Sequence, residues 1–317
     1  MNNGNQRSGE LHHISQTLLR TISSVPGMPG SRSSSVETKP KRETKMEECE
    51  CRTCGSKFEG EVTTFFIFQP PRQVKDRECP ACRQKRDEEE KKLEEQEREI
   101  QRIALRERWR KECGIPWGLH CTQFEDFEPE FQRRALRLCR EYAENFDLGN
   151  PKGMPSLYLY SKEPGVGKTT LMACIATHLI NNWRGDPSNT GLPIRFENGP
   201  GLVRRVRATY NISEAQKAYH ETEEQVYAQL RGVKLLMLDD MGKEKPSDFT
   251  RELYWYIINE RVTHGLPVVI SSRLPLETGG PLEELVKYDT VNRLVGMCRG
   301  KIVALTGTSY RTRKLVP

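Results

Sequence analysis

Short apolar runs alternate with helical patterns through the C-terminal part of the chain. Runs of apolar and β-branched residues predict strands at 156–161, 192–197, 233–240, 266–272 and 301–307. Apolar residues that recur every three to four positions predict helices at 129–146, 169–180, 202–210, 214–230 and 247–262. Strands that alternate with helices indicate an α/β fold, in which helices cover both faces of a parallel sheet.

The N-terminal part lacks this pattern. Residues 1–46 are rich in Ser, Gly, Asn and charged residues, which predicts a disordered tail. Within the tail, a few apolar residues share one helical face: Leu11, Ile14, Leu18, Leu19 and Ile22. This short amphipathic segment is either a frayed helix without a role or a partner-binding motif.

A charged segment separates the tail region from the α/β part. Residues 86–112 are dense in Glu, Lys and Arg at i, i+4 spacing, which predicts a solvated connecting helix. The segment has no apolar heptad stripe, so a coiled coil is not expected. We therefore expect a tail at 1–46, a cysteine-bearing domain at 47–85, a linker helix at 86–112 and a globular domain at 113–317.

Composition adds only a little to the prediction of fold and function. Of the 317 residues 35% are hydrophobic, so the apolar core is expected to occupy only part of the chain. A formal net charge of +6 is too mild to assign a nucleic-acid partner. No run of about 18 apolar residues and no signal-peptide pattern is present, so we expect a cytoplasmic protein without a membrane span.

Two cysteine pairs predict a metal site. Cys51 and Cys54 form one C-x-x-C turn, Cys79 and Cys82 form another, and 24 residues separate the pairs. Two such turns can place four thiolates around one ion, which is typical of the structural Zn²⁺ of a zinc ribbon. Cys49 could replace Cys51, and free thiols are the alternative to a metal.

The sequence "SKEPGVGKTT" predicts a phosphate-binding loop between a strand and a helix. Gly165 and Gly167 allow backbone N–H groups to turn toward a phosphate. Lys168 would contact the β- and γ-phosphate oxygens, and Thr169 would offer its hydroxyl to Mg²⁺. The loop residues expected to hold ATP are Pro164, Gly165, Val166, Gly167, Lys168, Thr169 and Thr170. Lys162 stands where the pattern has its first glycine; alternatively Ser161 takes that place in a loop one residue longer.

Two carboxylates end the apolar run at 235–240. Asp239 can hold Mg²⁺, and Asp240 can orient or deprotonate the attacking water. The Asp240 side chain is one methylene shorter than the Glu of fast ATPases, so we expect slow, switch-like hydrolysis of ATP.

The motifs "GIPWGLHCTQFEDFE", "PGVGKTTL", "LLMLDDMGKE", "VVISSRL", "VNRL" and "GTSYRTR" together resemble a known family. They are similar to the AAA+ ATPases that include DnaC/DnaI-type helicase loaders and IstB-type transposition helpers. The resemblance covers about residues 112–313. It implies an AAA+ P-loop domain with a five-stranded parallel sheet flanked by helices and with little or no lid.

The resemblance also implies roles for single residues. Ser272 stands where the family usually has a sensor Asn that probes the γ-phosphate. Arg293 matches the arginine that reaches the nucleotide of a neighbouring subunit, and Arg311 matches the sensor arginine of its own subunit. Gly114, Ile115 and Pro116 resemble the segment that lines the adenine pocket, and Ile115 is the residue expected to contact the nucleotide. A solvated surface charge is the alternative for both arginines.

Family members form rings or spirals and hold single-stranded DNA in a central channel. A basic stretch could contribute to this contact here: Arg204, Arg205, Arg207 and Tyr210. An ordinary basic helix face explains the same residues equally well.

The N-terminal cysteine domain is similar to that of DnaI-type loaders and favours one function. We expect an ATP-dependent loader that places a DnaB-type replicative helicase on single-stranded DNA and assembles as a homo-oligomer. The alternatives are an IstB-type helper of transposition and a zinc-ribbon adaptor whose ATPase is vestigial. Whether the ribbon contacts helicase or DNA stays open.

Overall fold

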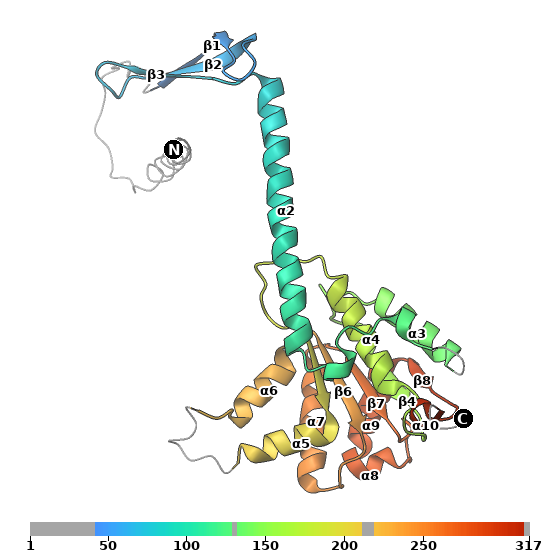
Figure 1. Cartoon of the computed structure of the whole chain (residues 1–317). Helices are drawn as coiled ribbons and strands as arrows, with labels where there is room; N and C mark the ends of the chain where they lie inside the picture. The colour runs from blue at the N-terminus through green and yellow to red at the C-terminus, as the bar shows by residue number, and fades with distance from the viewer. Residues whose placement is uncertain (1–41, 129–131, 211–218, 314–317) are drawn as a thin grey trace, which may run out of the picture. The chain divides into compact units, whose positions relative to one another are not determined.

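The computed structural model describes residues 42–128, 132–210 and 219–313, drawn in colour in Figure 1. The amphipathic segment predicted between Leu11 and Ile22 lies outside the described residues. The chain divides into two compact units, Met1–Asp87 and Glu88–Pro317. In the described parts, no helix has the length and apolarity that crossing a membrane requires.

The first unit is a small antiparallel sheet with strand order β1-β2-β3. Its strands are β1 (Arg42–Glu50), β2 (Lys57–Phe65) and β3 (Arg72–Lys75). Few of its described apolar side chains are buried: Cys49, Cys51, Val62 and Cys79. So small an apolar core stabilises a domain poorly, and small domains usually compensate with a metal or disulfides.

Helix α2 (Pro80–Glu112) begins inside the second cysteine pair, directly after Cys79, and carries Cys82 in its first turn. The side chains of residues 91–98 are all exposed, as expected of a solvated connecting helix. The last turns differ, because Leu105, Arg106 and Trp109 are buried. The Arg106 guanidinium donates to the Trp183 carbonyl oxygen at 2.5 Å, and the Trp109 and Trp183 rings meet edge to face. The C-terminal turns of α2 are therefore part of the second unit.

The second unit is built on a parallel sheet with strand order β5-β6-β7-β4-β8. Its strands are β4 (Leu157–Tyr160), β5 (Ile194–Asn198), β6 (Leu235–Met241), β7 (Val268–Ser272) and β8 (Ile302–Ala304). The predicted five-stranded parallel sheet is thus confirmed. The strands β6 and β7 are buried on both faces, which explains their nearly continuous apolar sequences.

Helices cover both faces of the sheet, as Figure 1 shows. Helices α3 (Arg133–Glu144) and α4 (Lys168–Asn181) contribute to one apolar core. The other core is formed with α5 (Gly199–Ala208), α6 (Glu223–Gly232), α7 (Asp248–Thr263), α8 (Leu282–Val286) and α9 (Tyr288–Cys298). Beyond β8, the described chain adds one short helix, α10 (Tyr310–Arg313), and no separate lid.

Two short 3-10 helices, η1 (Trp117–Leu119) and η2 (Phe124–Asp126), lie between α2 and α3. The chain enters this segment at Gly114, where φ is +90° and a Cβ would collide with the Phe196 carbonyl oxygen. Next to it, the Phe196 N–H donates to the Cys113 carbonyl oxygen at 2.6 Å. Only glycine fits this close approach to strand β5, which fixes the segment beside the carboxyl edge of the sheet.

Candidate active site and metal centre

The predicted phosphate loop connects β4 to α4. Gly165 has φ +71° and Gly167, the N-cap of α4, has φ +100°. A Cβ at Gly165 would collide with Ser309, and one at Gly167 would lie 2.8 Å from the Phe127 ring. Both positions therefore need glycine for backbone conformation and for space. Lys162, the unusual residue at the start of the loop, is exposed and leaves this geometry intact.

Lys168 points across the loop that precedes it. Its Nζ donates to the Ser161 carbonyl oxygen at 3.2 Å and to that of Glu163 at 3.3 Å. Burial lowers the pKa of Lys168, the negative charge of Asp240 raises it, and the positive charge of Arg273 lowers it further. The ammonium group thus lies in an environment that an additional anion would stabilise.

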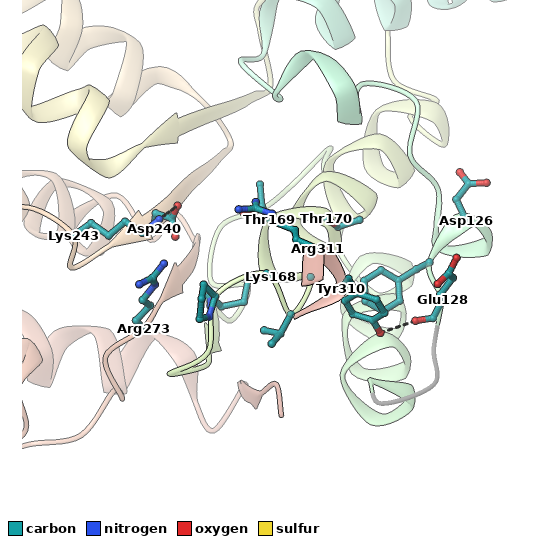
Figure 2. Close-up of a pocket in the computed structure, with 15 residues that line it drawn as sticks. Asp126, Glu128, Lys168, Thr169, Thr170, Asp240, Lys243, Arg273, Tyr310 and Arg311 are labelled. Carbon is teal, nitrogen blue, oxygen red and sulfur yellow. Dashed lines mark hydrogen bonds and ion pairs between the residues drawn. The ribbon is translucent and has the colours of Figure 1, made fainter. Parts of the chain in front are cut away.

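The loop borders a cavity of about 490 Å³, within the usual size range of small-molecule sites. Its lining is Asp126, Phe127, Glu128, Pro164, Gly165, Val166, Gly167, Lys168, Thr169, Thr170, Asp240, Lys243, Arg273, Tyr310 and Arg311 (Figure 2). The sensor arginine implied by the resemblance, Arg311, lies on this wall, beside all seven loop residues predicted to hold ATP.

Asp239, near the carboxyl end of β6, does not line the cavity and is only 4% exposed. Its carboxylate accepts from Thr169 Oγ1 at 3.0 Å and from Ser271 Oγ at 2.5 Å. Burial raises the pKa of Asp239, while the two hydroxyl donors lower it. In the described part of the chain Asp239 forms no ion pair with a side chain, so its buried charge suits a divalent cation shared with Thr169.

Asp240 takes the left-handed backbone conformation, with φ +57°. Its N–H donates to Ser271 Oγ at 2.9 Å, and its Oδ2 accepts from Lys243 Nζ at 2.6 Å. The register between β6 and β7 shifts between Leu238 and Met241, so one extra residue stands in β6. Adjacent strand residues normally face opposite sides of a sheet; this bulge instead allows Asp240 to line the cavity next to Asp239.

Three residues implied by the resemblance lie elsewhere. Ser272 is fully buried, and its hydroxyl donates to the Met241 carbonyl oxygen at 2.6 Å and accepts from the Leu274 N–H at 3.0 Å. Ile115 is 3% exposed and belongs to the apolar core. Arg293, on α9, lies over the Trp255 ring at 5.7 Å. None of the three lines the cavity.

Sequence reasoning missed several polar residues of the site. Asp126, Glu128 and Tyr310 line the cavity from other segments, and three more stand near the ends of β6 and β7. Ser271 bridges the acid pair, and Lys243 and Arg273 line the cavity. Each stands within a few residues of a predicted strand end, at the carboxyl edge where parallel sheets bind ligands. A position at the carboxyl end of a predicted strand indicates that a residue lies near the ligand. It does not indicate which of two neighbouring residues faces the ligand.

The four predicted metal cysteines converge in the first unit. The sulfur atoms of Cys51, Cys54, Cys79 and Cys82 all lie within 4.8 Å of one another. Cys49 is outside this group and packs against Gly60 on β2, so the geometry favours Cys51 over Cys49 as a ligand.

The thiols in this cluster differ in acidity. The backbone N–H of Cys79, which donates to Cys51 Sγ at 3.3 Å, lowers the pKa of Cys51 to about 6. The neighbouring thiols Cys54 and Cys79 raise the pKa of Cys82 to about 12. Four crowded thiols cannot all ionise without a cation among them, which is the chemistry of a Cys₄ metal site.

No protein-family model matches the chain. The replicative helicase loader DnaC of Buchnera aphidicola subsp. Baizongia pistaciae is 28% identical over 145 residues, 45% of this chain and 51% of that protein. The match thus spans about half the length of that relative. The replicative helicase loader DnaC of Escherichia coli (strain K12) is 24% identical over 221 residues, 68% of this chain and 80% of that protein.

Two solved structures are also similar. The crystal structure of the DnaC helicase loader has 23% identity and a TM-score of 0.45, covering 60% of this chain and 98% of that one. The crystal structure of the DnaI has 21% identity and a TM-score of 0.44, covering 62% and 94%. By its sequence the chain is similar to proteins named replicative helicase loader DnaC, as its motifs predict. The five-stranded parallel sheet of its second unit agrees with the predicted α/β fold.

Proposed function

We propose that this chain is an ATP-dependent loader of a DnaB-type replicative helicase onto single-stranded DNA, acting in the cytoplasm. The observation that carries the proposal is that Lys168, Thr169 and Asp240 line one cavity and Thr169 is bonded to Asp239, in a chain similar to DnaC loaders. The proposed cofactors are ATP and Mg²⁺ at this cavity and Zn²⁺ at the four cysteines.

The residues predicted to bind nucleotide and Mg²⁺ have distinct tasks in this proposal. The loop from Pro164 to Thr170 binds the phosphates with its N–H groups and with Lys168. Thr169 and Asp239 hold Mg²⁺, which neutralises phosphate charge when bound. Asp240 orients the attacking water and accepts its proton. Arg311 contacts the nucleotide of its own subunit, and its place on the cavity wall supports that task.

Arg293 is proposed to act on a neighbouring subunit. The residue lies away from the cavity of its own chain, over Trp255 on α7, and one guanidinium nitrogen is buried without a partner among the described residues. A ring or spiral of subunits would bring it to the next nucleotide, where arginine stabilises transition-state charge. Hydrolysis would then depend on assembly.

Mixing two variants tests this arrangement. Lys168→Ala should abolish nucleotide binding, and Arg293→Ala should leave binding intact but lose turnover. In a mixture, Lys168→Ala subunits still supply Arg293 to the intact pockets of their partners. ATP turnover should therefore partly return; a mixture as inactive as its components would refute action between subunits.

The DNA contact is proposed for part of α5. Arg205 forms ion pairs within its own chain, and Arg207 lies over the Phe249 ring at 4.9 Å. Arg204 is exposed and is the residue best placed to meet a phosphate. Tyr210 is also exposed and packs edge to face against Phe249.

The decisive experiment combines the purified protein with the replicative helicase of its host. A stable complex, and ATP-dependent transfer of the helicase onto circular single-stranded DNA, would support a loader. No complex, together with ATP-dependent filaments on duplex DNA, would instead indicate a transposition helper. Helicase binding without any ATP hydrolysis would indicate an adaptor with a vestigial ATPase.

A further inference from the structure

Ser272, the residue expected to contact the terminal phosphate, forms its hydrogen bonds with backbone groups instead. Ser272 ends β7 at the sensor position, yet it is fully buried and its hydroxyl is used by the Met241 carbonyl and the Leu274 N–H. A Ser hydroxyl has one proton to donate, and here that proton is given to Met241. Ser272 therefore has no donor left for a phosphate oxygen.

The next residue, Arg273, lines the cavity instead. Figure 2 shows its side chain beside Asp240 and Lys243, with Asp126 and Glu128 on the opposite side of the cavity. In the described part of the chain, Arg273 makes no hydrogen bond or ion pair, whereas Lys243 is paired with Asp240. Arg273 thus keeps all five N–H donors of its guanidinium group for a ligand.

The strand order explains why this position meets the end of a triphosphate. Strand β7 lies between β6, which carries the acid pair, and β4, which leads into the phosphate loop. A residue at the carboxyl end of β7 therefore stands between Lys168 and Asp240. If the α- and β-phosphates of a nucleotide lie in the phosphate loop, its γ-phosphate lies between Lys168 and Asp240. Asp240 is the residue proposed to orient water.

Charge supports the same placement. The cavity receives positive side chains from Lys168, Lys243, Arg273 and Arg311, and the positive charge of Arg273 acts on Lys168. Two like charges on one wall repel each other, and an anion bound between them removes that repulsion.

We propose that Arg273 binds the terminal phosphate of the nucleotide held by its own subunit and so makes the site selective for ATP over ADP. The inference rests on the proposed nucleotide site. A guanidinium group can bind two phosphate oxygens at once, which a serine at the neighbouring position cannot. Arg273 differs from Arg293 in acting without a partner subunit.

The test is equilibrium binding of the non-hydrolysable ATP analogue AMPPNP and of ADP, each with Mg²⁺, to the full chain. Arg273→Ala should weaken analogue binding about 10- to 100-fold, the effect of losing a charge-assisted pair, and change ADP binding less than about twofold. Arg273→Lys, which keeps the charge but loses the planar fork, should fall between Arg273→Ala and wild type. Arg137→Ala is the matched control, because Arg137 is an exposed arginine on α3 outside the cavity.

The outcomes separate this inference from the nucleotide site itself. Analogue binding unchanged in Arg273→Ala, or analogue and ADP weakened equally, would overturn the role of Arg273 and leave the site standing. If wild type binds neither ligand, both proposals fail together. Melting temperatures of the variants should match wild type, since the Arg273 side chain is exposed.

Discussion

Arg205 decides between two interpretations of the basic helix α5. Its guanidinium donates to both carboxylate oxygens of Glu221, at 2.6 and 2.7 Å, and to Glu197 at 2.5 Å. It also donates to Gln229 on α6 at 2.6 Å. Arg205 therefore joins the end of β5, helix α5, the segment before α6 and α6 itself, so we expect Arg205→Ala to destabilise the fold rather than weaken DNA binding directly.

The magnitude follows from partial burial. The side chains of Arg205 and Glu197 are 22% and 12% exposed, and that of Glu221 is 31% exposed. Breaking a fully buried pair costs about 3–5 kcal/mol, and exposed pairs are worth about 0–1 kcal/mol, so solvent screening places this network near 2 kcal/mol. For a unit of the size of Glu88–Pro317, that loss lowers the melting temperature by about 4–8 °C.

The assay is thermal unfolding beside titration with single-stranded DNA over a range of salt concentrations. Arg204→Ala is the matched control: an exposed neighbour on the same helix, it should keep the wild-type melting temperature and reduce the salt dependence of DNA binding by about one phosphate contact. An Arg205→Ala variant with normal stability and weakened DNA binding would refute this reasoning and make Arg205 a DNA contact.

The same network predicts a pH dependence. The hydrogen bonds from Arg205 lower the pKa of Glu221 in the folded protein. A lowered folded pKa means that the pair stabilises the protein above the ordinary Glu value of about 4.3 and loses this contribution as pH falls below it. The difference in melting temperature between wild type and Arg205→Ala should therefore be full at pH 7 and shrink below about pH 4.

Further variants test the metal site and the acid pair. Metal analysis should find about one Zn²⁺ per chain in wild type and in Cys49→Ser but little in Cys79→Ser, and chelation should unfold the first unit. Ser271→Ala should raise the Mg²⁺ concentration needed for ATP turnover about 10-fold, whereas Ser272→Ala should cost about 1–2 kcal/mol of stability without changing that requirement. Lys243→Met should lower ATP turnover about two- to fivefold, because Lys243 leaves Asp240 to bind phosphate once the nucleotide is seated; raised turnover would mean that Lys243 only restrains Asp240.

Sequence reasoning worked where local pattern decides structure. The strands of a parallel sheet are buried on both faces, so runs such as 235–238 are apolar without alternation and are visible in the sequence. The phosphate loop is equally visible, because Gly165 and Gly167 are required by backbone conformation. The cysteine pairs, too, identify their partners by spacing.

Sequence reasoning failed where a shift of one residue in strand register decides which side chain faces the site. Ser271 and Ser272 are adjacent and chemically identical, yet one binds the acid pair and the other the backbone of Met241. Their difference depends on the bulge at Asp240, which arises from pairing between β6 and β7 rather than from local sequence. For the same reason the sequence could not show that Arg273, one residue beyond the expected sensor, faces the cavity.

The contacts in the cavity bear on how the site would act as a switch. Asp240 is paired with Lys243, and Lys168 is bonded to loop carbonyl oxygens. To bind both lysines, the phosphates of a nucleotide would replace Asp240 at Lys243 and the carbonyl oxygens at Lys168. The Asp240 carboxylate would then be free to orient water. The Lys243–Asp240 pair is partly exposed, with side chains 38% and 23% accessible, so it is worth about 1 kcal/mol or less and is readily exchanged for phosphate. In the proposed site, such a pair would keep Asp240 from acting until the nucleotide is seated, so that hydrolysis would follow binding.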